Sequence, residues 1–214
     1  MPRTIDDARF WDRTARKYAA DVIADPAGYE RTLERTQHYL RAADAVLEVG
    51  CGTGTTALRL APCVASLVAT DVSGEMIAIA REKAAAQGCV NAVFETARAD
   101  APDRPDGSFD VVLAFNVLHL VAARDAVLRN IHRLLKPGGL FISKTPCLTQ
   151  MGLPVRLLVP VMQAIGKAPH VAFFTDAELE REITAAGFKI VERARHGTRG
   201  KDTRPFLVAR KRAG

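Results

Sequence analysis

The stretch Val46-Leu-Glu-Val-Gly-Cys-Gly-Thr-Gly54 decides the fold of this chain of 214 residues. It joins a short apolar run to a loop with three glycines, and a helical pattern begins directly after it at Thr55. Glycine tolerates positive φ and lets a loop backbone lie close to a ligand. The stretch therefore predicts a β-strand, a tight ligand-binding loop and a helix in immediate succession.

The same alternation of short apolar runs and helical patterns continues to about residue 145. Strands are predicted at residues 45–49, 65–70, 92–96, 109–115 and 140–144, and helices at 55–60, 73–87 and 124–135. Strands that alternate with helices predict parallel βαβ units and a doubly wound α/β sheet. Later in the chain, a capping box at Thr175 and Glu178 starts a helix that ends near Gly187. Two further strands, 188–194 and 205–209, are expected to form a hairpin.

Composition excludes several classes of protein. Hydrophobic residues make up 48% and charged residues 25% of the chain, which is typical of a globular domain. The four cysteines form no C-x-x-C pair, so we expect no metal site and a reduced, cytoplasmic chain. The sequence shows neither the apolar core of a signal peptide nor a stretch long enough to span a bilayer. The net charge of +6 is compatible with an anionic binding partner. An aromatic content of 6% without a base-stacking platform argues that this partner is not a nucleic acid.

Two acidic residues stand at the carboxyl ends of the first two predicted strands, near the glycine loop. Glu48 stands just before the loop, and Asp71 ends the next strand, 21 residues after Gly50. Both points fall at the carboxyl edge of adjacent strands, where doubly wound sheets bind ligands. A carboxylate at Asp71 can accept hydrogen bonds from a ribose diol, whereas Glu48 repels phosphate and suits a cationic ligand.

Two other nucleotide-binding motifs do not match this loop. A dinucleotide site has the pattern G-x-G-x-x-G/A, and counted from Gly50 its third position is Thr55, so the match fails. A P-loop is excluded because the G-K-[S/T] element is absent. A nicotinamide-dependent reductase nevertheless stays as the alternative enzyme class.

The chain resembles the class I S-adenosylmethionine-dependent methyltransferases, of the small-molecule, ubiquinone- and menaquinone-biosynthesis-like type. The resemblance covers about residues 45–145. Leu47-Glu-Val-Gly-Cys-Gly-Thr-Gly54 looks like the first motif of that family, and Thr70-Asp-Val-Ser73 like its ribose-binding segment. The stretches Phe109-Asp-Val-Val-Leu-Ala-Phe-Asn-Val-Leu-His119 and Leu134-Leu-Lys-Pro-Gly-Gly-Leu-Phe141 are similar to its fourth-strand motif and its turn before the fifth strand. The resemblance implies a Rossmann-like sheet of seven mostly parallel strands whose last strand is antiparallel.

The resemblance also implies S-adenosyl-L-methionine as cofactor and S-adenosyl-L-homocysteine as product. Glu48 would then face the methionine ammonium, Asp71 the ribose, and Asp100 the adenine amino group. The remaining residues assigned to the cofactor are in the glycine loop and around the adenine: Gly50, Cys51, Gly52, Gly54, Val72, Met76, Ala99 and Asn116. Met76 as a core residue and Asp100 as a turn residue are the structural alternatives.

The expected reaction is methyl transfer by in-line displacement to a small or lipid-like acceptor. His119 is a candidate general base and Tyr18 a candidate contact to the donor; Trp11, Lys144 and His170 are further candidates on the acceptor side. The alternative for His119 is a hydrogen-bonded wall residue. A non-catalytic S-adenosylmethionine-binding protein stays open as a third interpretation.

We expect a single methyltransferase domain over residues 1–214 with four parts. These are a helical cap (1–43), the cofactor-binding core (44–145), an apolar lid or insertion (146–174), and a C-terminal helix and hairpin (175–214). The apolar part is predicted to cover an apolar acceptor, and its alternative is a helix packed on the core. It could also make peripheral contact with a membrane surface.

Overall fold

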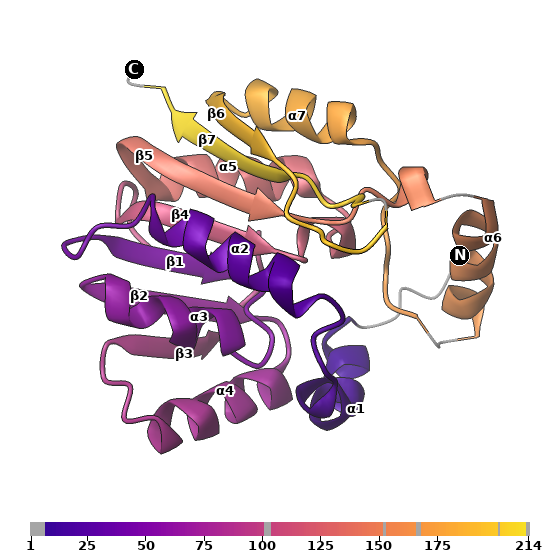
Figure 1. Ribbon diagram of the computed structural model, residues 1–214, viewed down its shortest axis with the longest axis horizontal. Helices are drawn as coiled ribbons and strands as arrows, with labels where there is room; N and C mark the ends of the chain where they lie inside the picture. The colour runs from indigo at the N-terminus through magenta and orange to yellow at the C-terminus, as the bar shows by residue number, and fades with distance from the viewer. Residues whose placement is uncertain (1–6, 101–103, 152, 166–167, 201, 213–214) are drawn as a thin grey trace.

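The computed structural model describes residues 7–100, 104–151, 153–165, 168–200 and 202–212. Its centre is one seven-stranded sheet in the order β3-β2-β1-β4-β5-β7-β6 (Figure 1). The first five strands pair in parallel, and β7 is antiparallel to both of its neighbours, β5 and β6. The strands are β1 (Ala45–Val49), β2 (Ser66–Asp71), β3 (Ala92–Thr96), β4 (Phe109–Phe115), β5 (Leu135–Lys144), β6 (Phe188–Ala194) and β7 (Phe206–Lys211). The predicted fold class, including the antiparallel last strand, is confirmed.

Helices cover both faces of this sheet. They are α1 (Asp7–Ala20), α2 (Pro26–Gln37), α3 (Thr55–Leu60), α4 (Gly74–Ala86), α5 (Arg124–Leu134), α6 (Leu153–Ala164) and α7 (Asp176–Ala185). Successive residues of β1 point to opposite faces: Leu47 and Val49 pack with α5 and α7, whereas Val46 packs with α2, α3 and α4. This burial on both faces explains why the strands are continuously apolar rather than alternating.

Short 3₁₀ turns complete the connections at Ala61–Cys63, Leu118–Leu120 and Leu148–Met151. The helix ends follow the expected capping chemistry. The Ser73 hydroxyl accepts from the Met76 N–H at 3.1 Å, and both halves of the capping box between Thr175 and Glu178 are formed. These caps fix the starts of α4 and α7 close to the predicted positions.

The boundaries of β5 differ from the prediction. Pro137-Gly138-Gly139 indicates a turn, and we expect the strand to begin at residue 140. In the structure Leu135 already pairs with Phe109, and the register then shifts before Val111 pairs with Leu140. The Pro-Gly-Gly sequence is therefore an irregularity within the strand pairing and does not separate α5 from β5 by a free turn.

The N-terminal part forms two helices that pack differently. α1 lies against α4, where Ala15, Met76 and Ile79 form a small buried cluster with Trp11. α2 lies on the sheet face beside α3, and α6 stands away from the helices that flank the sheet (Figure 1). Within the described residues, no helix has both the length and the apolar character required to cross a bilayer.

Candidate functional site

A cavity of about 630 Å³ opens at the carboxyl edge of β1, β2 and β4. The strand order reverses at β1, with β2 on one side and β4 on the other, and such a switch point is where doubly wound sheets bind ligands. Nearly all of the predicted cofactor residues line it: Glu48, Gly50, Cys51, Gly52, Asp71, Val72, Met76, Ala99, Asp100 and Asn116. The sequence thus placed ten of eleven assigned residues around one cavity.

The eleventh residue, Gly54, has a different surrounding. Its φ is +73°, and a Cβ at this position would lie 2.7 Å from Phe94 Cε1 and 2.8 Å from Ala80 Cβ. Gly52 also has a positive φ, +55°, but a Cβ there would meet only Tyr18 Cε1 at 3.7 Å. Gly54 therefore lets α3 and α4 approach β3, whereas Gly52 keeps the loop open on its cavity side.

Glu48 is a buried carboxylate without a complete set of partners. Its side chain is 2% exposed, it faces the cavity, and its Oε2 atom has no hydrogen-bond partner among the described residues. Burial, together with the nearby Asp71 carboxylate, raises the pKa of Glu48 to about 8. A cationic donor in the cavity would satisfy Oε2 and stabilise the ionised carboxylate.

Asp71 holds the glycine loop in place. Its Oδ2 accepts from the Gly52 N–H at 2.9 Å, and its Oδ1 accepts from the Ser73 N–H at 3.0 Å. Burial raises the pKa of Asp71 in spite of these hydrogen bonds. Because each carboxylate oxygen has a further lone pair, Asp71 can organise the loop and still accept from two ligand hydroxyls.

Asp100 is engaged in an ion pair. Both of its carboxylate oxygens accept from the Arg98 guanidinium, at 2.9 and 2.8 Å, and this guanidinium lowers the pKa of Asp100. The sequence did not indicate this pair. It orients Asp100 at the wall of the cavity, and the assignment of this residue to the adenine amino group stays a prediction.

Helix α1 covers the cavity opposite the glycine loop. The Ser73 hydroxyl donates to Asp12 at 2.6 Å and so ties α1 to the start of α4. Trp11 and Tyr18 both line the cavity, with their rings edge to face at 6.2 Å. Burial, followed by the Asp71 carboxylate, raises the pKa of Tyr18, so its phenol is neutral and can donate a hydrogen bond.

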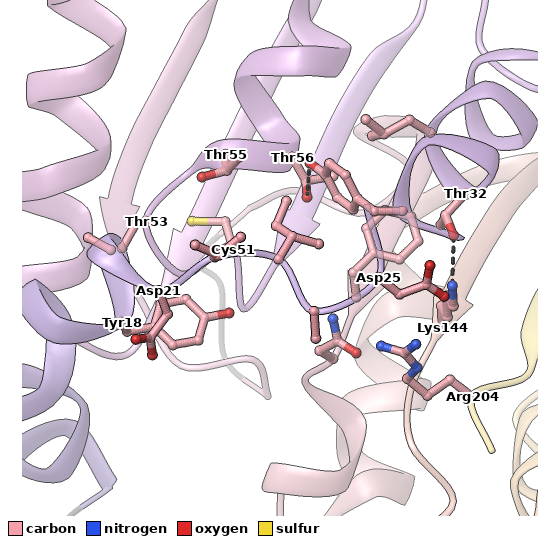
Figure 2. A pocket seen from close by; sticks show the side chains of 18 residues that line it. Tyr18, Asp21, Asp25, Thr32, Cys51, Thr53, Thr55, Thr56, Lys144 and Arg204 are labelled. Carbon is pink, nitrogen blue, oxygen red and sulfur yellow. Dashed lines mark hydrogen bonds between the residues drawn. The ribbon is translucent and has the colours of Figure 1, made fainter. Parts of the chain in front are cut away.

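Figure 2 shows the residues of a second cavity, of about 330 Å³, which adjoins the first because the two share part of their lining. Five residues line both: Tyr18, Cys51, Thr56, Phe115 and Asn116. The rest of its wall comes from the end of α1, the connection between α1 and α2, α2 itself, the glycine loop with the start of α3, the end of β5 and the segment before β7. These residues are Ala19, Asp21, Val22, Ile23, Ala24, Asp25, Tyr29, Thr32, Leu33, Thr53, Thr55, Lys144 and Arg204.

Asn116 lies at the junction of the two cavities with an unusual backbone. Its φ is +53°, the only positive value among the described non-glycine residues, and its N–H donates to the Lys144 carbonyl at 2.7 Å. Asparagine tolerates this conformation better than most residues. Such conformations cluster at functional sites, and here the turn directs the chain after β4 around the junction.

Two predicted acceptor-side histidines lie elsewhere. His119 is on the 3₁₀ turn after β4 but lines neither cavity; its Nδ1 is 3.0 Å from the Thr145 hydroxyl, and burial lowers its pKa to about 4. This is the geometry of the alternative interpretation, a hydrogen-bonded wall residue, and we assign no reacting-atom role to it. His170 is exposed, and its backbone N–H is 3.3 Å from Asp7 Oδ1.

The sequence missed part of the second cavity. Within the described residues, none of 146–174 lines either cavity, although this part was expected to cover the acceptor. The part of the second cavity's wall that the sequence did not predict includes residues 21–25 and Arg204. Only Asp25, which caps α2 ahead of Pro26, carried a signal that could have located part of this wall.

Comparisons with known proteins identify relatives of the core and of the fold. A family model described as a methyltransferase domain matches residues 46–139, from the start of β1 into β5. The ubiquinone/menaquinone biosynthesis C-methyltransferase UbiE of Marinomonas sp. is 32% identical over 141 residues, which cover 62% of this chain and 55% of that relative. The chain thus spans about half the length of this relative.

Two other proteins match over most of the chain. A ubiquinone biosynthesis O-methyltransferase of Sinorhizobium fredii is 26% identical over 202 residues, which cover 87% of this chain and 79% of that relative. The structure of the CcbJ methyltransferase of Streptomyces caelestis covers 98% of this chain and 100% of its own, with a TM-score of 0.76 and 25% identity. The chain is therefore similar to the class I S-adenosylmethionine-dependent methyltransferases of the UbiE-like type over its core, and it has their fold over most of its length.

Proposed function

We propose that this protein transfers a methyl group from S-adenosylmethionine to a small-molecule acceptor bound in the second cavity. One observation carries the proposal: the unpartnered carboxylate oxygen of Glu48 faces a cavity that adjoins a second one. When bound, S-adenosylmethionine supplies a methyl group already activated by a sulfonium. The chain then has to bind, orient and shield the two molecules.

The residues around the larger cavity fit this cofactor. Glu48 would accept from its ammonium and complete the hydrogen bonding of Oε2. Asp71 would accept from the ribose hydroxyls with its remaining lone pairs. Val72 and Met76 supply apolar wall where the adenine would lie. A cavity of about 630 Å³ is within the usual range for ligands of this size.

The junction residues would position the acceptor. Tyr18 lines both cavities and lies over Gly52, so it can limit the access of water to the point where they meet. Holding two reactants in a fixed geometry can supply a large part of the acceleration of a displacement. The assignment of Tyr18 as a catalytic residue stays a prediction. His119 is given no step, and this mechanism requires no general base when the acceptor atom carries a free electron pair.

The class of acceptor follows from the second cavity and from the relatives. A volume of about 330 Å³ suits a compact organic molecule. Relatives named for ubiquinone and menaquinone biosynthesis support such an acceptor. A lipid-like acceptor and a peripheral membrane contact through residues 146–174 stay predictions; Leu158, Val161 and Ile165 of this part are exposed. The proposal includes a cytoplasmic location, because the four cysteines are free thiols.

The reductase alternative has little support from this site. A dinucleotide needs an anion-favouring helix start at its pyrophosphate, whereas here Glu48 and Asp71 place two carboxylates at the same edge. A non-catalytic binding protein would have the same larger cavity, and turnover separates it from an enzyme.

The experiment is a pair of titrations followed by an acceptor screen. Calorimetry with S-adenosylhomocysteine should give saturable binding, whereas NADH and NADPH should give none. Incubation with S-adenosylmethionine and a panel of small acceptors should then release S-adenosylhomocysteine. Tight binding of NADPH in place of S-adenosylhomocysteine would overturn the proposal, and binding without release for every acceptor would favour the non-catalytic interpretation.

A further inference from the structure

Two cationic side chains face the same end of the second cavity. Lys144 is the last residue of β5 and is 6% exposed, and Arg204 comes from the segment just before β7. Figure 2 shows their charged groups in one region of the cavity, away from Tyr18 and Asp21 at the other end. Both residues line the cavity and neither lines the larger one.

Lys144 has a neutral partner only. Its Nζ donates to the Thr32 hydroxyl at 2.8 Å, and no described carboxylate lies at ion-pair distance from it. The Thr32 hydroxyl itself donates to the Gly28 carbonyl at 2.8 Å and lies 3.1 Å from His196 Nδ1. A hydroxyl held in this way fixes the position of the ammonium but does not neutralise its charge.

The carboxylates nearest to this end are committed to the protein scaffold. Asp25 accepts from the Gly28 N–H at 3.0 Å, from the Thr198 N–H at 2.7 Å and from the Thr198 hydroxyl. Asp202 accepts from the N–H groups of Gly197 and Arg204 at 2.7 and 3.0 Å. These bonds close the loop between β6 and β7 against the start of α2.

Arg204 is only weakly paired with Asp202. Its Nε lies 3.4 Å from Asp202 Oδ1, and its Nη1 and Nη2 atoms have no hydrogen-bond partner among the described residues. Asp21, the other acidic residue of the cavity, is exposed to solvent at the opposite end. The end at Lys144 and Arg204 therefore holds two cations and two carboxylates, and among the described residues the groups that it leaves unused are the Nη1 and Nη2 donors of Arg204.

An anion in this position would use donors that the protein leaves free. Burial, followed by the charge of Arg204, lowers the pKa of Lys144, whereas the Asp202 and Asp25 carboxylates act in the opposite direction. A guanidinium and an ammonium with free N–H donors on one side of a cavity match the oxygens of a carboxylate or phosphate. A neutral acceptor would leave these donors unsatisfied when it displaced water.

We propose that the acceptor carries an anionic oxygen group, a carboxylate or a phosphate, which Lys144 and Arg204 bind. This inference rests on the proposed function, since it names the class of acceptor for the same site. The anionic group would hold one end of the acceptor, so that the remainder extends along the cavity toward its junction with the cofactor site. Lys144 and Arg204 are then residues that determine specificity for the acceptor.

The test compares charged and neutral probes of similar shape on the full chain. Calorimetry of the protein saturated with S-adenosylhomocysteine would measure the binding of benzoate, phenyl phosphate and benzamide. Charge-assisted hydrogen bonds make us expect at least one anion to bind about 10-fold or more tightly than benzamide. The relative affinities of benzoate and phenyl phosphate distinguish a carboxylate from a phosphate acceptor.

The variants Lys144→Gln and Arg204→Gln should each lower the affinity for the anion about 10-fold or more and leave the affinity for benzamide unchanged. Lys189→Gln, which removes an exposed lysine of β6, is the matched control and should bind the anion as the wild type does. Affinity for S-adenosylhomocysteine and the melting temperature show that each variant is folded, and two independent variants keep the test valid if one is not.

Three results would overturn the inference while S-adenosylhomocysteine still binds. They are equal affinity for benzoate, phenyl phosphate and benzamide, anion binding that neither variant weakens, and the absence of saturable anion binding. Failure of S-adenosylhomocysteine itself to bind would instead overturn the proposed function.

Discussion

Replacing Glu48 by glutamine tests the electrostatic basis of the cofactor site. The substitution keeps the shape of the side chain and removes a carboxylate whose Oε2 has no described partner. A hydrogen bond to a charged group contributes about 1.5–3 kcal/mol. Glu48→Gln should therefore lower the affinity for S-adenosylhomocysteine about 10- to 150-fold at pH 7.5. Calorimetry measures this directly, with Glu34→Gln on the exposed side of α2 as the control.

The pH dependence of binding gives an independent check. With a pKa of about 8 in the free protein, Glu48 must lose a proton to bind an ammonium in its ionised form. The ionised fraction rises about 25-fold between pH 6 and pH 7.5, and wild-type affinity for S-adenosylhomocysteine should rise by a similar factor. Glu48→Gln should show no such rise. A wild-type affinity that is constant over this range would refute the reasoning.

The same substitution should stabilise the free protein. The pKa of Glu48 is raised from its ordinary 4.5 to about 8, so the folded state keeps a proton that the unfolded state releases. This contribution to stability is fully present below about pH 4.5 and is lost as the pH rises to about 8. Glutamine cannot ionise, so at pH 8 we expect the free variant to be more stable by up to a few kcal/mol, because each tenfold change in a proton-binding constant corresponds to about 1.4 kcal/mol. Thermal melting without ligand measures this, and a lower melting temperature for Glu48→Gln would contradict it.

Three further substitutions address individual residues of the site. Gly54→Ala should destabilise the fold by about 2 kcal/mol or more, because the φ of this residue is +73° and the new Cβ meets Phe94. Gly74→Ala is the control, since a Cβ at Gly74 has no atom within 4 Å, and its free energy of unfolding in denaturant should be close to that of the wild type. Tyr18→Phe should lower kcat about two- to tenfold without changing the melting temperature, since only the hydroxyl is lost; unchanged donor affinity and turnover would count against its role. His119→Gln should leave turnover near that of the wild type. Wild-type rates should show no inflection from this ring near pH 6.5, because its pKa is lowered to about 4. A fall in turnover of about a hundredfold in the variant would support the general-base role.

The fold was predictable because its signals are local. The alternation between β1 residues such as Val46 and Leu47 places apolar side chains on both faces of the sheet, and caps such as Ser73 mark the helix starts. The start of β5 was not predictable in this way. Leu135 extends the strand because Phe109 of β4 offers it a partner, and this depends on long-range pairing across an irregular register.

The placement of residues around the larger cavity was also largely predictable. These residues stand in short segments whose positions relative to strand ends are set by the sequence, as with Glu48 before the loop and Asp71 at the end of β2. What the sequence could not give was the side-chain pairing within these segments. Asp100 pairs with Arg98, two residues away, and the His119 ring contacts the Thr145 hydroxyl. Side-chain rotamers and neighbouring residues determine these contacts, and the spacing of residues along the sequence does not.

The acceptor half was not predictable, because it is assembled from segments that are distant along the chain. Thr32 from α2, Lys144 from β5 and Arg204 from the segment before β7 meet only after the antiparallel β7 has inserted between β5 and β6. No periodicity connects these three residues, although Lys144 was among the predicted acceptor-side candidates. The proposed recognition of the acceptor therefore depends on tertiary assembly, as is usual when function is built on loops around a common scaffold.

The two cavities are complementary in their unused hydrogen-bonding groups, and this links the two proposals. The larger one contains the buried carboxyl group of Glu48 without a full set of partners, and the smaller one contains two cationic side chains whose N–H donors are only partly used. Unsatisfied groups of this kind are costly in the free protein and are stabilised by ligands of opposite charge. A cationic donor and an anionic acceptor would each satisfy one of them. A donor site with Glu48 therefore rejects a diphosphate for the same electrostatic reason that an acceptor site with Lys144 and Arg204 favours an anion.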